Sequence, residues 1–307
     1  MDSLRINTYR PQYNHRYNPS FQGGLKSLNE LNPISRYADR YFRRVALESR
    51  RNIHNIIPEL QTKLDIIPIK STRKITISAW DIKPNNSDQY VLFLHGMSQN
   101  VSNYQSLYKQ INQQNIGIFA VEYRGYGANH PANFSEDKLR HDVEVAYKYL
   151  TDKKGIKPEN ITVIGHSMGG ALATNFASNH PDIKSLILIC PIVNAAKIGE
   201  KFALNKTIGE GIPASVKSFT NRIKPLNWLY SLRLSSLLKM KSNKVPTYII
   251  QSKNDVVTPV GSARILAKVA KRQGILQDIQ ILENGGHIVD RNKVNIVSKF
   301  LDKIYSK

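Results

Sequence analysis

The segment ITVIGHSMGGALA at residues 161–173 constrains the fold of this chain more than any other. An apolar run, ITVI, leads into Gly165-His166-Ser167-Met168-Gly169, and the helix-forming residues GALATNFA follow. The two glycines of a G-x-S-x-G sequence let a strand turn sharply into a helix with the serine exposed at the turn. Ser167 is therefore predicted to be a nucleophile, and the alternative is a hydroxyl that caps the following helix.

Strands and helices alternate from about residue 63 to the C-terminus. Short β-branched runs are expected to be strands, and the longer amphipathic segments between them are expected to be helices. The predicted strands are 63–70, 74–80, 90–96, 116–125, 161–167, 185–191, 246–255 and 278–287, and the first two are expected to form a hairpin. Helices are predicted near 101–114, 136–153, 168–179 and 260–273, with a final one at the C-terminus. The order predicts an α/β fold with a mostly parallel eight-stranded sheet, helices on both faces, and functional residues at the carboxyl ends of the strands.

Changes of composition divide the chain into three predicted regions. Residues 63–191 and 246–307 are expected to form the core. Residues 1–62 are expected to be a basic, partly disordered extension with an arginine-rich amphipathic helix near 34–57. Residues 192–245 interrupt the alternation with ten Lys or Arg against Glu200 and Glu210, and are expected to be a basic helical insertion. In it Trp228, Leu229 and Leu232 lie at helical spacing and are expected to cover the mouth of a pocket.

The net charge of +21 needs a physical explanation. A strongly basic surface attracts anionic partners, and both nucleic acids and membrane lipids are anionic. Because no zinc-finger, RNA-binding-sheet or basic-zipper pattern accompanies the charge, nucleic acid is not expected as a partner. The helix near 34–57 is expected to pack on the core, and the alternative is contact of this helix and the insertion with an anionic membrane.

The sequence also predicts a cellular location. The first thirty residues lack the apolar core of a secretory signal, and apolar runs such as VLFLHGM are too short to span a bilayer. A cytoplasmic or peripheral-membrane location is expected, with an organelle presequence as the alternative because the N-terminal residues are basic and nearly free of acids. Cys190 is the only cysteine, which excludes intramolecular disulfides and cysteine-rich metal sites, and it is expected in the core.

A serine hydroxyl needs a base to take its proton and an acid to orient that base. Asp255 follows one apolar strand in IIQSKNDVVTP, and His287 follows the next in ILENGGHIVD. The chain order Ser167, Asp255, His287 is one in which such triads occur. A turn aspartate and an exposed loop histidine are the alternatives for the last two. Other candidates fit less well. His95 and His166 precede or flank the nucleophile, and His141 and His180 fall on or at the end of predicted helices. Asn254 has no charge, Asp278 starts a predicted strand, and Asp290 is expected in the final helix.

Acyl transfer also requires N–H donors for the negative charge that develops on the carbonyl oxygen. One donor is expected to be the backbone N–H of Met168, directly after the nucleophile. The second is expected to be the Met97 amide in LHGMSQN, after the strand at 90–96. The alternative for His95 and Gly96 is a tight turn without a ligand, although such a turn would itself aim the Met97 amide.

Five segments resemble the α/β-hydrolase superfamily: LHGMSQN, VEYRGYG at 121–127, GHSMGG at 165–170, QSKNDVVTP and GGH. The resemblance covers about residues 63–305. GHSMGG with YRGYG is similar to the monoacylglycerol lipase and serine aminopeptidase-like branch and to membrane-associated acyl-protein thioesterases. The resemblance implies attack by serine on a carbonyl and release of the acyl-enzyme by water, without metal or cofactor. It also implies that residues 192–245 are a cap that shapes the substrate pocket.

The sequence therefore predicts a serine hydrolase that cleaves a carboxylic ester or thioester of a lipid or other acylated substrate. Two alternatives stay open. A peptidase or amidase of the same fold would need an acidic group for the substrate amine, and the cap has only Glu200 and Glu210. A non-catalytic membrane-docking protein with a retained fold would usually lack a triad or oxyanion element, since fold alone does not establish activity.

Overall fold

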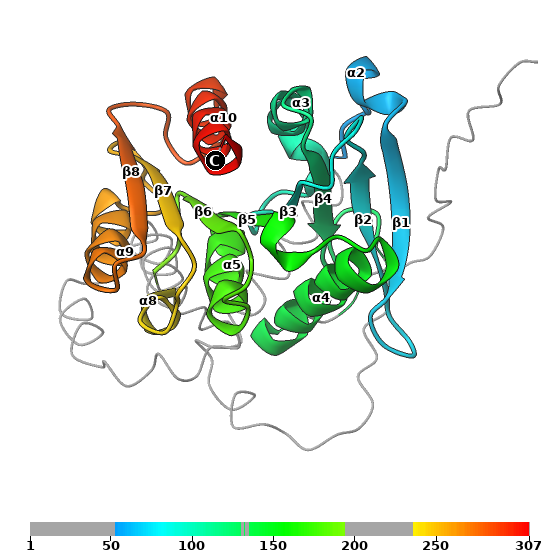
Figure 1. Ribbon diagram of the computed structural model, residues 1–307, viewed down its shortest axis with the longest axis horizontal. Coiled ribbons are helices and arrows are strands. Elements are labelled where there is room, and N and C mark those ends of the chain that lie inside the picture. Colours follow the sequence, from blue (N-terminus) through cyan, green and yellow to red (C-terminus); the bar gives the residue numbers. More distant parts are fainter. Residues whose placement is uncertain (1–52, 130–131, 133–134, 194–235, 307) are drawn as a thin grey trace, which may run out of the picture.

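The computed structural model describes residues 53–129, 132, 135–193 and 236–306. In this part of the chain an eight-stranded sheet has the strand order β1-β2-β4-β3-β5-β6-β7-β8 (Figure 1). The strands are β1 Leu64–Lys70, β2 Thr76–Ile82, β3 Tyr90–Leu94, β4 Gly117–Glu122, β5 Ile161–His166, β6 Ser185–Ile189, β7 Thr247–Ser252 and β8 Leu276–Leu282. β2 is antiparallel to both β1 and β4, and every later pair is parallel. The prediction of a mostly parallel eight-stranded sheet is confirmed, including its opening hairpin.

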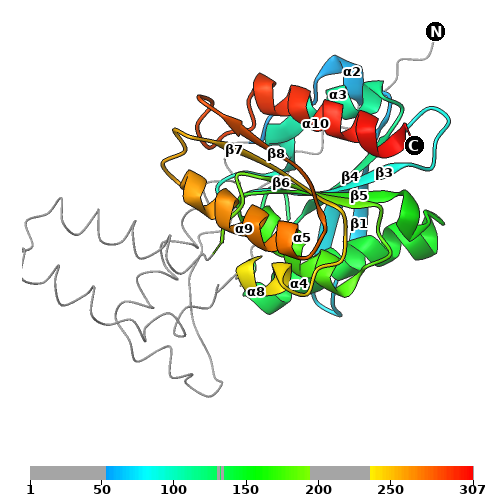
Figure 2. The ribbon, with the colours of Figure 1, turned by 60° about the vertical axis from the view of Figure 1, so that its left-hand side comes forward.

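Helices cover both faces of the sheet, as Figures 1 and 2 show. One face carries α3 Gln105–Gln113 and α10 Arg291–Tyr305; the other carries α4 Glu136–Lys148, α5 Met168–Asn179, α8 Ser236–Met240 and α9 Val260–Arg272. The short α2 helix spans Pro58–Gln61. A 3₁₀ turn at Val101–Tyr104 precedes α3, one at Pro158–Asn160 precedes β5, and a π turn at Tyr149–Lys153 follows α4. Two apolar clusters form the core, one between the sheet and each helical layer.

The central strands bring the residues of the site to one edge of the sheet. All residues of β3, β5 and β6 are buried, as their continuous apolar runs predict for parallel strands covered on both faces. Leu94 at the end of β3 pairs with Gly165 near the end of β5. Because these strands are parallel, the loops that follow them leave the sheet side by side. β7 and β8 run in the same direction, so the residues after them emerge at the same edge.

Some sequence predictions fall on parts of the chain outside the described residues. These parts include the helix predicted near 34–57 as far as residue 52, and most of the predicted cap with Trp228, Leu229 and Leu232. Residues 53–57 are not helical and lead into α2. The domain boundaries therefore stay predictions. Within the described ranges, no helix combines the length and apolar content that crossing a bilayer requires.

A buried ion pair connects the loop after β4 to α4 and to the opening hairpin. Arg124 Nη2 lies 2.6 Å from Asp142 Oδ1, and Arg124 Nε lies 2.9 Å from Asp142 Oδ2. The hydroxyl of Ser71, at the end of β1, donates to Asp142 Oδ1 at 2.7 Å. Only 5% of the Arg124 side chain and none of the Asp142 side chain is exposed. Removal of one partner would leave the other charge buried without compensation.

We expect Asp142→Ala to lower the free energy of unfolding by about 3 kcal/mol or more, since it leaves Arg124 buried and unpaired. Urea unfolding followed by circular dichroism measures the change. Asp137→Ala is the matched control, because it lies on the same helix with 93% of its side chain exposed. Its effect should stay within about 0.5 kcal/mol. Equal, small effects for the two variants would contradict a structural role for the buried pair.

Candidate active site

The turn between β5 and α5 is held in a strained conformation. Ser167 has φ 54° and ψ −114°, in the half of conformational space that residues other than glycine rarely adopt. A Cβ at Gly165 would lie 2.4 Å from the Gly169 carbonyl oxygen, and a Cβ at Gly169 would lie 2.0 Å from that of Leu94. Neither position has room for a side chain. Ser167 occupies the N-cap position of α5, yet its hydroxyl makes no capping hydrogen bond.

Ser167, His287 and Asp255 form a hydrogen-bonded chain at the carboxyl edge of the sheet. Ser167 Oγ lies 2.9 Å from His287 Nε2, and His287 Nδ1 lies 2.8 Å from Asp255 Oδ2. A carboxylate can only accept a hydrogen bond, so His287 Nδ1 carries the proton and Nε2 is left to accept the proton of the serine hydroxyl. Such an arrangement allows the imidazole to act as a general base toward Ser167.

The Asp255 carboxylate is held by its own segment of chain. The backbone N–H groups of Val257 and Thr258 donate to Oδ1 at 2.9 and 2.8 Å. The Thr258 hydroxyl and the Gln251 side-chain amide donate to Oδ2 at 2.7 and 3.0 Å. Burial opposes the charged form, but the hydrogen bonds from His287 and Thr258 and the attraction of His287 hold the pKa of Asp255 well below its usual range. The carboxylate is therefore an anion of fixed orientation.

The sequence did not assign a role to Gln251 or Thr258. Both lie in QSKNDVVTP, which was singled out for Asp255 alone. The sequence did contain a signal for Gln251. A glutamine at the end of an apolar strand is expected to be buried, and a buried side-chain amide needs hydrogen-bond partners.

The two amides predicted to bind an oxyanion belong to segments that flank Ser167. Met168 is the first residue of α5, so its N–H is among those that an α-helix leaves without an intrahelical acceptor. A Cβ placed on Gly96 would lie 3.4 Å from the Ser167 Cβ, so the loop after β3 runs against the serine. Met97 follows in this loop, partly buried against the core. Their role as oxyanion donors stays a prediction.

A second buried pair lies behind this loop. His95 Nε2 is 3.0 Å from Glu122 Oε1, and both side chains are almost completely buried. Glu122 Oε2 accepts the N–H of Val101 at 3.2 Å, and His95 Nδ1 lies 2.8 Å from the Gly96 carbonyl oxygen. Glu122 therefore contacts the loop after β3 through the N–H of Val101, while His95 Nε2 and Glu122 Oε1 lie close together without a hydrogen bond among the described residues. The pair was not expected from the sequence.

The remaining candidates from the sequence lie apart from the hydrogen-bonded chain. His141 lies in α4 and bonds to the Ser71 carbonyl oxygen, and His180 ends α5 and contacts Glu144. Asp278 lies within β8, which begins two residues earlier than predicted. Asp290 was expected inside the final helix, but it is the N-cap of α10, where its carboxylate accepts the N–H of Lys293. Asn254 accepts the N–H of Gly286.

His166, directly before Ser167, is buried beside this site. Burial and the repulsion of His287 lower the pKa of His166 from 6.5 to about 3. The unfolded chain takes up a proton at this imidazole below about pH 6.5, but the native protein does not until near pH 3. Because the unfolded state binds more protons in this window, this group makes stability fall as the pH is lowered.

Known proteins resemble this chain in sequence and in fold. The family model for serine aminopeptidases, S33, matches residues 85–210. Monoacylglycerol lipase abhd6-A of Xenopus laevis is 27% identical over 270 residues, which cover 73% of this chain and 78% of that protein. A Mycoplasma pneumoniae protein with esterase/lipase in its name is 26% identical over 219 residues, 62% of this chain and 81% of that protein. The structure of an esterase from Pyrococcus furiosus has a TM-score of 0.64 at 22% identity, over 82% of this chain and 94% of that one.

The sheet, the turn at Ser167 and these relatives define the class of the protein. The chain belongs to the α/β-hydrolase superfamily, and the resemblance found in its motifs is confirmed. Within the superfamily it is an enzyme of the esterase and lipase type.

The lowered pKa of His166 predicts a specific pH dependence of stability. His166→Gln has no imidazole at this position, so its stability should fall less than that of the wild type as the pH is lowered from 6.5. The difference between the two free energies of unfolding should change by up to about 1.4 kcal/mol per pH unit. Urea unfolding between pH 7 and pH 4.5 measures it. Parallel stability curves would show that His166 takes up its proton equally in both states.

Proposed function

We propose that this protein cleaves a carboxylic ester or thioester of a lipid or other acylated substrate through an acyl-enzyme. The observation that carries the proposal is the hydrogen-bonded chain Ser167–His287–Asp255, with distances of 2.9 and 2.8 Å. A hydroxyl is a weak nucleophile, and this chain provides both the base and the anion that orients it. Ser167, His287 and Asp255 are the proposed catalytic triad.

The proposed reaction has two halves. Ser167 Oγ forms a bond to the acyl carbon while its proton passes to His287 Nε2, and the negative charge on the carbonyl oxygen is stabilised by the N–H groups of Met97 and Met168. His287 then gives the proton to the departing oxygen or sulfur, and the bond from the acyl carbon to that atom breaks. In the second half, water attacks the acyl-enzyme, His287 takes its proton, and the acid leaves as Ser167 regains a hydrogen. Asp255 stabilises the imidazolium in both halves.

Support for an apolar acyl group comes from the surface and from a relative. Ile288, the residue directly after the proposed base, is an apolar residue that exposes 63% of its surface. The similar Xenopus laevis protein is named a monoacylglycerol lipase. Trp228, Leu229 and Leu232 of the predicted cap would add further apolar contacts. Contact with an anionic membrane concerns residues mostly outside the described ranges and stays a prediction from the charge.

A second candidate is an amidase or peptidase, because the matching family model is described as serine aminopeptidase. The same triad can attack an amide carbonyl, but an aminopeptidase must also bind a free amine. Turnover of aminoacyl p-nitroanilides well above that of matched esters would favour this candidate over the esterase.

We expect Ser167→Ala to abolish labelling by a fluorophosphonate and to reduce ester turnover to background, since Ser167 is the residue whose hydroxyl lies 2.9 Å from His287 Nε2. Asp255→Asn should lower kcat by about 10⁴-fold, because an amide favours the wrong tautomer of His287. Ser178→Ala, on the same helix α5, is the matched control and should leave labelling and turnover unchanged. Labelling of Ser167→Ala at the wild-type rate would disprove the proposed nucleophile.

The proposed lipid specificity predicts a dependence on acyl chain length. Each CH₂ that becomes buried contributes about 0.8 kcal/mol, so kcat/KM should rise up to about 4-fold per CH₂ along a series of p-nitrophenyl esters from acetate toward decanoate. The same measurement on a series of acyl thioesters shows whether kcat/KM is higher with sulfur or with oxygen as the departing atom. A flat profile in both series would contradict a lipid-like substrate and leave the hydrolase chemistry untouched.

A further inference from the structure

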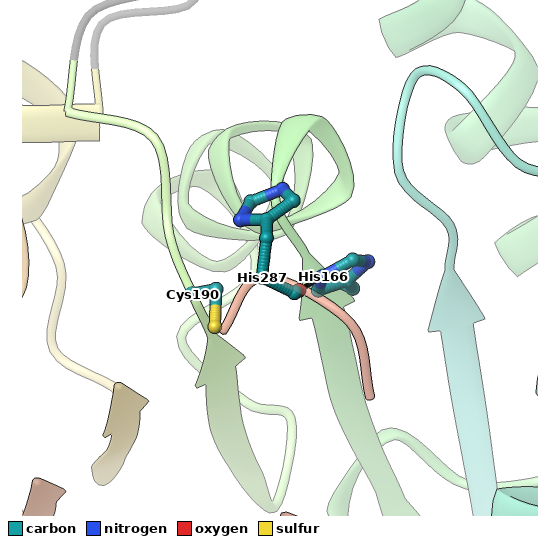
Figure 3. A group of neighbouring side chains, drawn as sticks. All are labelled: His166, Cys190 and His287. Carbon is teal, nitrogen blue, oxygen red and sulfur yellow. Dashed lines mark hydrogen bonds between the residues drawn. The ribbon is translucent and has the colours of Figure 1, made fainter. Parts of the chain in front are cut away.

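His166, Cys190 and His287 form a cluster of side chains next to the nucleophile (Figure 3). Each offers a potential metal-ligand atom, and these atoms lie within 4.8 Å of one another. The cluster does not suit a metal, because both nitrogens of His166 already lie at hydrogen-bond distance from oxygen atoms and His287 is held between Asp255 and Ser167. The hydrogen bonds of His166 point to a different role.

His166 connects two loops that meet at Ser167. Its Nε2 lies 2.8 Å from the main-chain carbonyl oxygen of His287, the contact drawn in Figure 3. Its Nδ1 lies 2.7 Å from the hydroxyl of Tyr104, which in turn accepts the N–H of Gly96 at 3.0 Å. One imidazole therefore reaches the loop that carries the proposed base and, through one phenol, the loop that carries Met97.

The direction of each hydrogen bond follows from the protons available. A carbonyl oxygen only accepts, so His166 Nε2 carries a proton. Because His166 is neutral, its Nδ1 has a lone pair and accepts the Tyr104 hydroxyl. Burial raises the pKa of Tyr104 well above its usual value, so the hydroxyl keeps its proton. The Gln99 side-chain oxygen also faces this hydroxyl, at 2.5 Å. Because a hydroxyl has one proton, donation to His166 requires the opposite orientation of the Gln99 amide, with its NH₂ toward Tyr104.

The packing around this network leaves little room for movement. A Cβ on Gly96 would lie 3.0 Å from His166 Nδ1, so the loop after β3 touches the imidazole directly. His166 and Tyr104 are 2% and 3% exposed. The next residue along the chain from His166 is the nucleophile itself. Any shift of the imidazole would therefore change the position of Gly96 and His287 relative to Ser167.

We propose that His166 is a positioning residue that, together with Tyr104, fixes the loop of Gly96 and Met97 and the loop of His287 against Ser167. The inference rests on the proposed function, since it assigns these loops to the oxyanion and the base. His166 itself neither takes nor gives a proton in the reaction. Displacement of catalytic groups by about 1 Å can cost about 10²-fold in rate, so such a brace acts on kcat.

Tyr104→Phe is the first test, because it removes the hydroxyl and keeps the ring. It should lower kcat and kcat/KM together by about 10-fold to 100-fold, with KM unchanged, since only the transition state uses the exact position of the amides. Tyr108→Phe is the matched control: Tyr108 is buried nearby, and its hydroxyl has no hydrogen-bond partner among the described residues. It should keep wild-type kcat.

His166→Gln and His166→Ala form the second test. Glutamine can still present an amide N–H toward the His287 carbonyl oxygen, so it should retain more activity than alanine. The loss in the double variant His166→Gln with Tyr104→Phe should be smaller than the product of the two single losses, because both break one network. The acid limb of the pH profile of kcat/KM should keep its midpoint in His166→Gln, since the pKa of His166 is lowered to about 3 and this imidazole stays neutral above that pH.

The outcomes separate this inference from the proposed function. If the wild type is not labelled by a fluorophosphonate, or Ser167→Ala turns over esters normally, the proposed function fails. If those tests succeed but Tyr104→Phe matches Tyr108→Phe in kcat, the positioning role is disproved. A shifted acid limb in His166→Gln would also disprove it, by making His166 a titrating participant. Should His166→Gln fail to fold, Tyr104→Phe alone decides.

Discussion

The close approach of α5 to the end of β3 is the constraint on which the rest of the site depends. Gly169 lies so near the Leu94 carbonyl oxygen that a side chain there would overlap it, and Gly165 is equally crowded against Gly169. This contact turns the chain at Ser167 into a conformation that serine rarely adopts. The turn sends the hydroxyl toward His287, begins α5 at Met168, and leaves His166 on the last position of β5 facing both neighbouring loops.

Two ionisable groups near Ser167 have strongly shifted pKa values, and they flank the proposed base. Asp255 stays an anion in spite of its burial, because donors surround its carboxylate. His166 stays neutral because it is buried and lies near a second histidine. Burial opposes the charged form of both groups. The partners of the Asp255 carboxylate outweigh it, whereas the His287 carbonyl oxygen and the Asp255 charge do not outweigh it at His166. His287 lies between them and contacts the hydroxyl of Ser167.

Local patterns were sufficient to predict the sheet, because buried parallel strands have continuous apolar sequences and the helices between them have a clear period. The same patterns placed Ser167, Asp255 and His287 at strand ends, which is why their meeting could be anticipated. Contacts between distant residues had no such signal. Nothing in the sequence links Tyr104 to His166, or Glu122 to His95, since these pairs form only when β3, β4 and β5 lie side by side. Asp290 shows that local patterns place the end of a helix less precisely than the helix itself. It was predicted inside the final helix and is its N-cap, one position before the first helical residue.

The order of strands has a consequence for how the chain acquires its reactivity. β3 and β5 are neighbours in the sheet, but β4, which lies between them in sequence, pairs on the far side of β3. The proposed base, His287, and the carboxylate that orients it, Asp255, lie in the loops after β8 and β7, the last two strands in chain order. Ser167 therefore has its hydrogen-bond partner only after β7, β8 and the loops that follow them have been synthesised and folded. On the proposed function, the nucleophile is activated only once these last strands have joined the sheet.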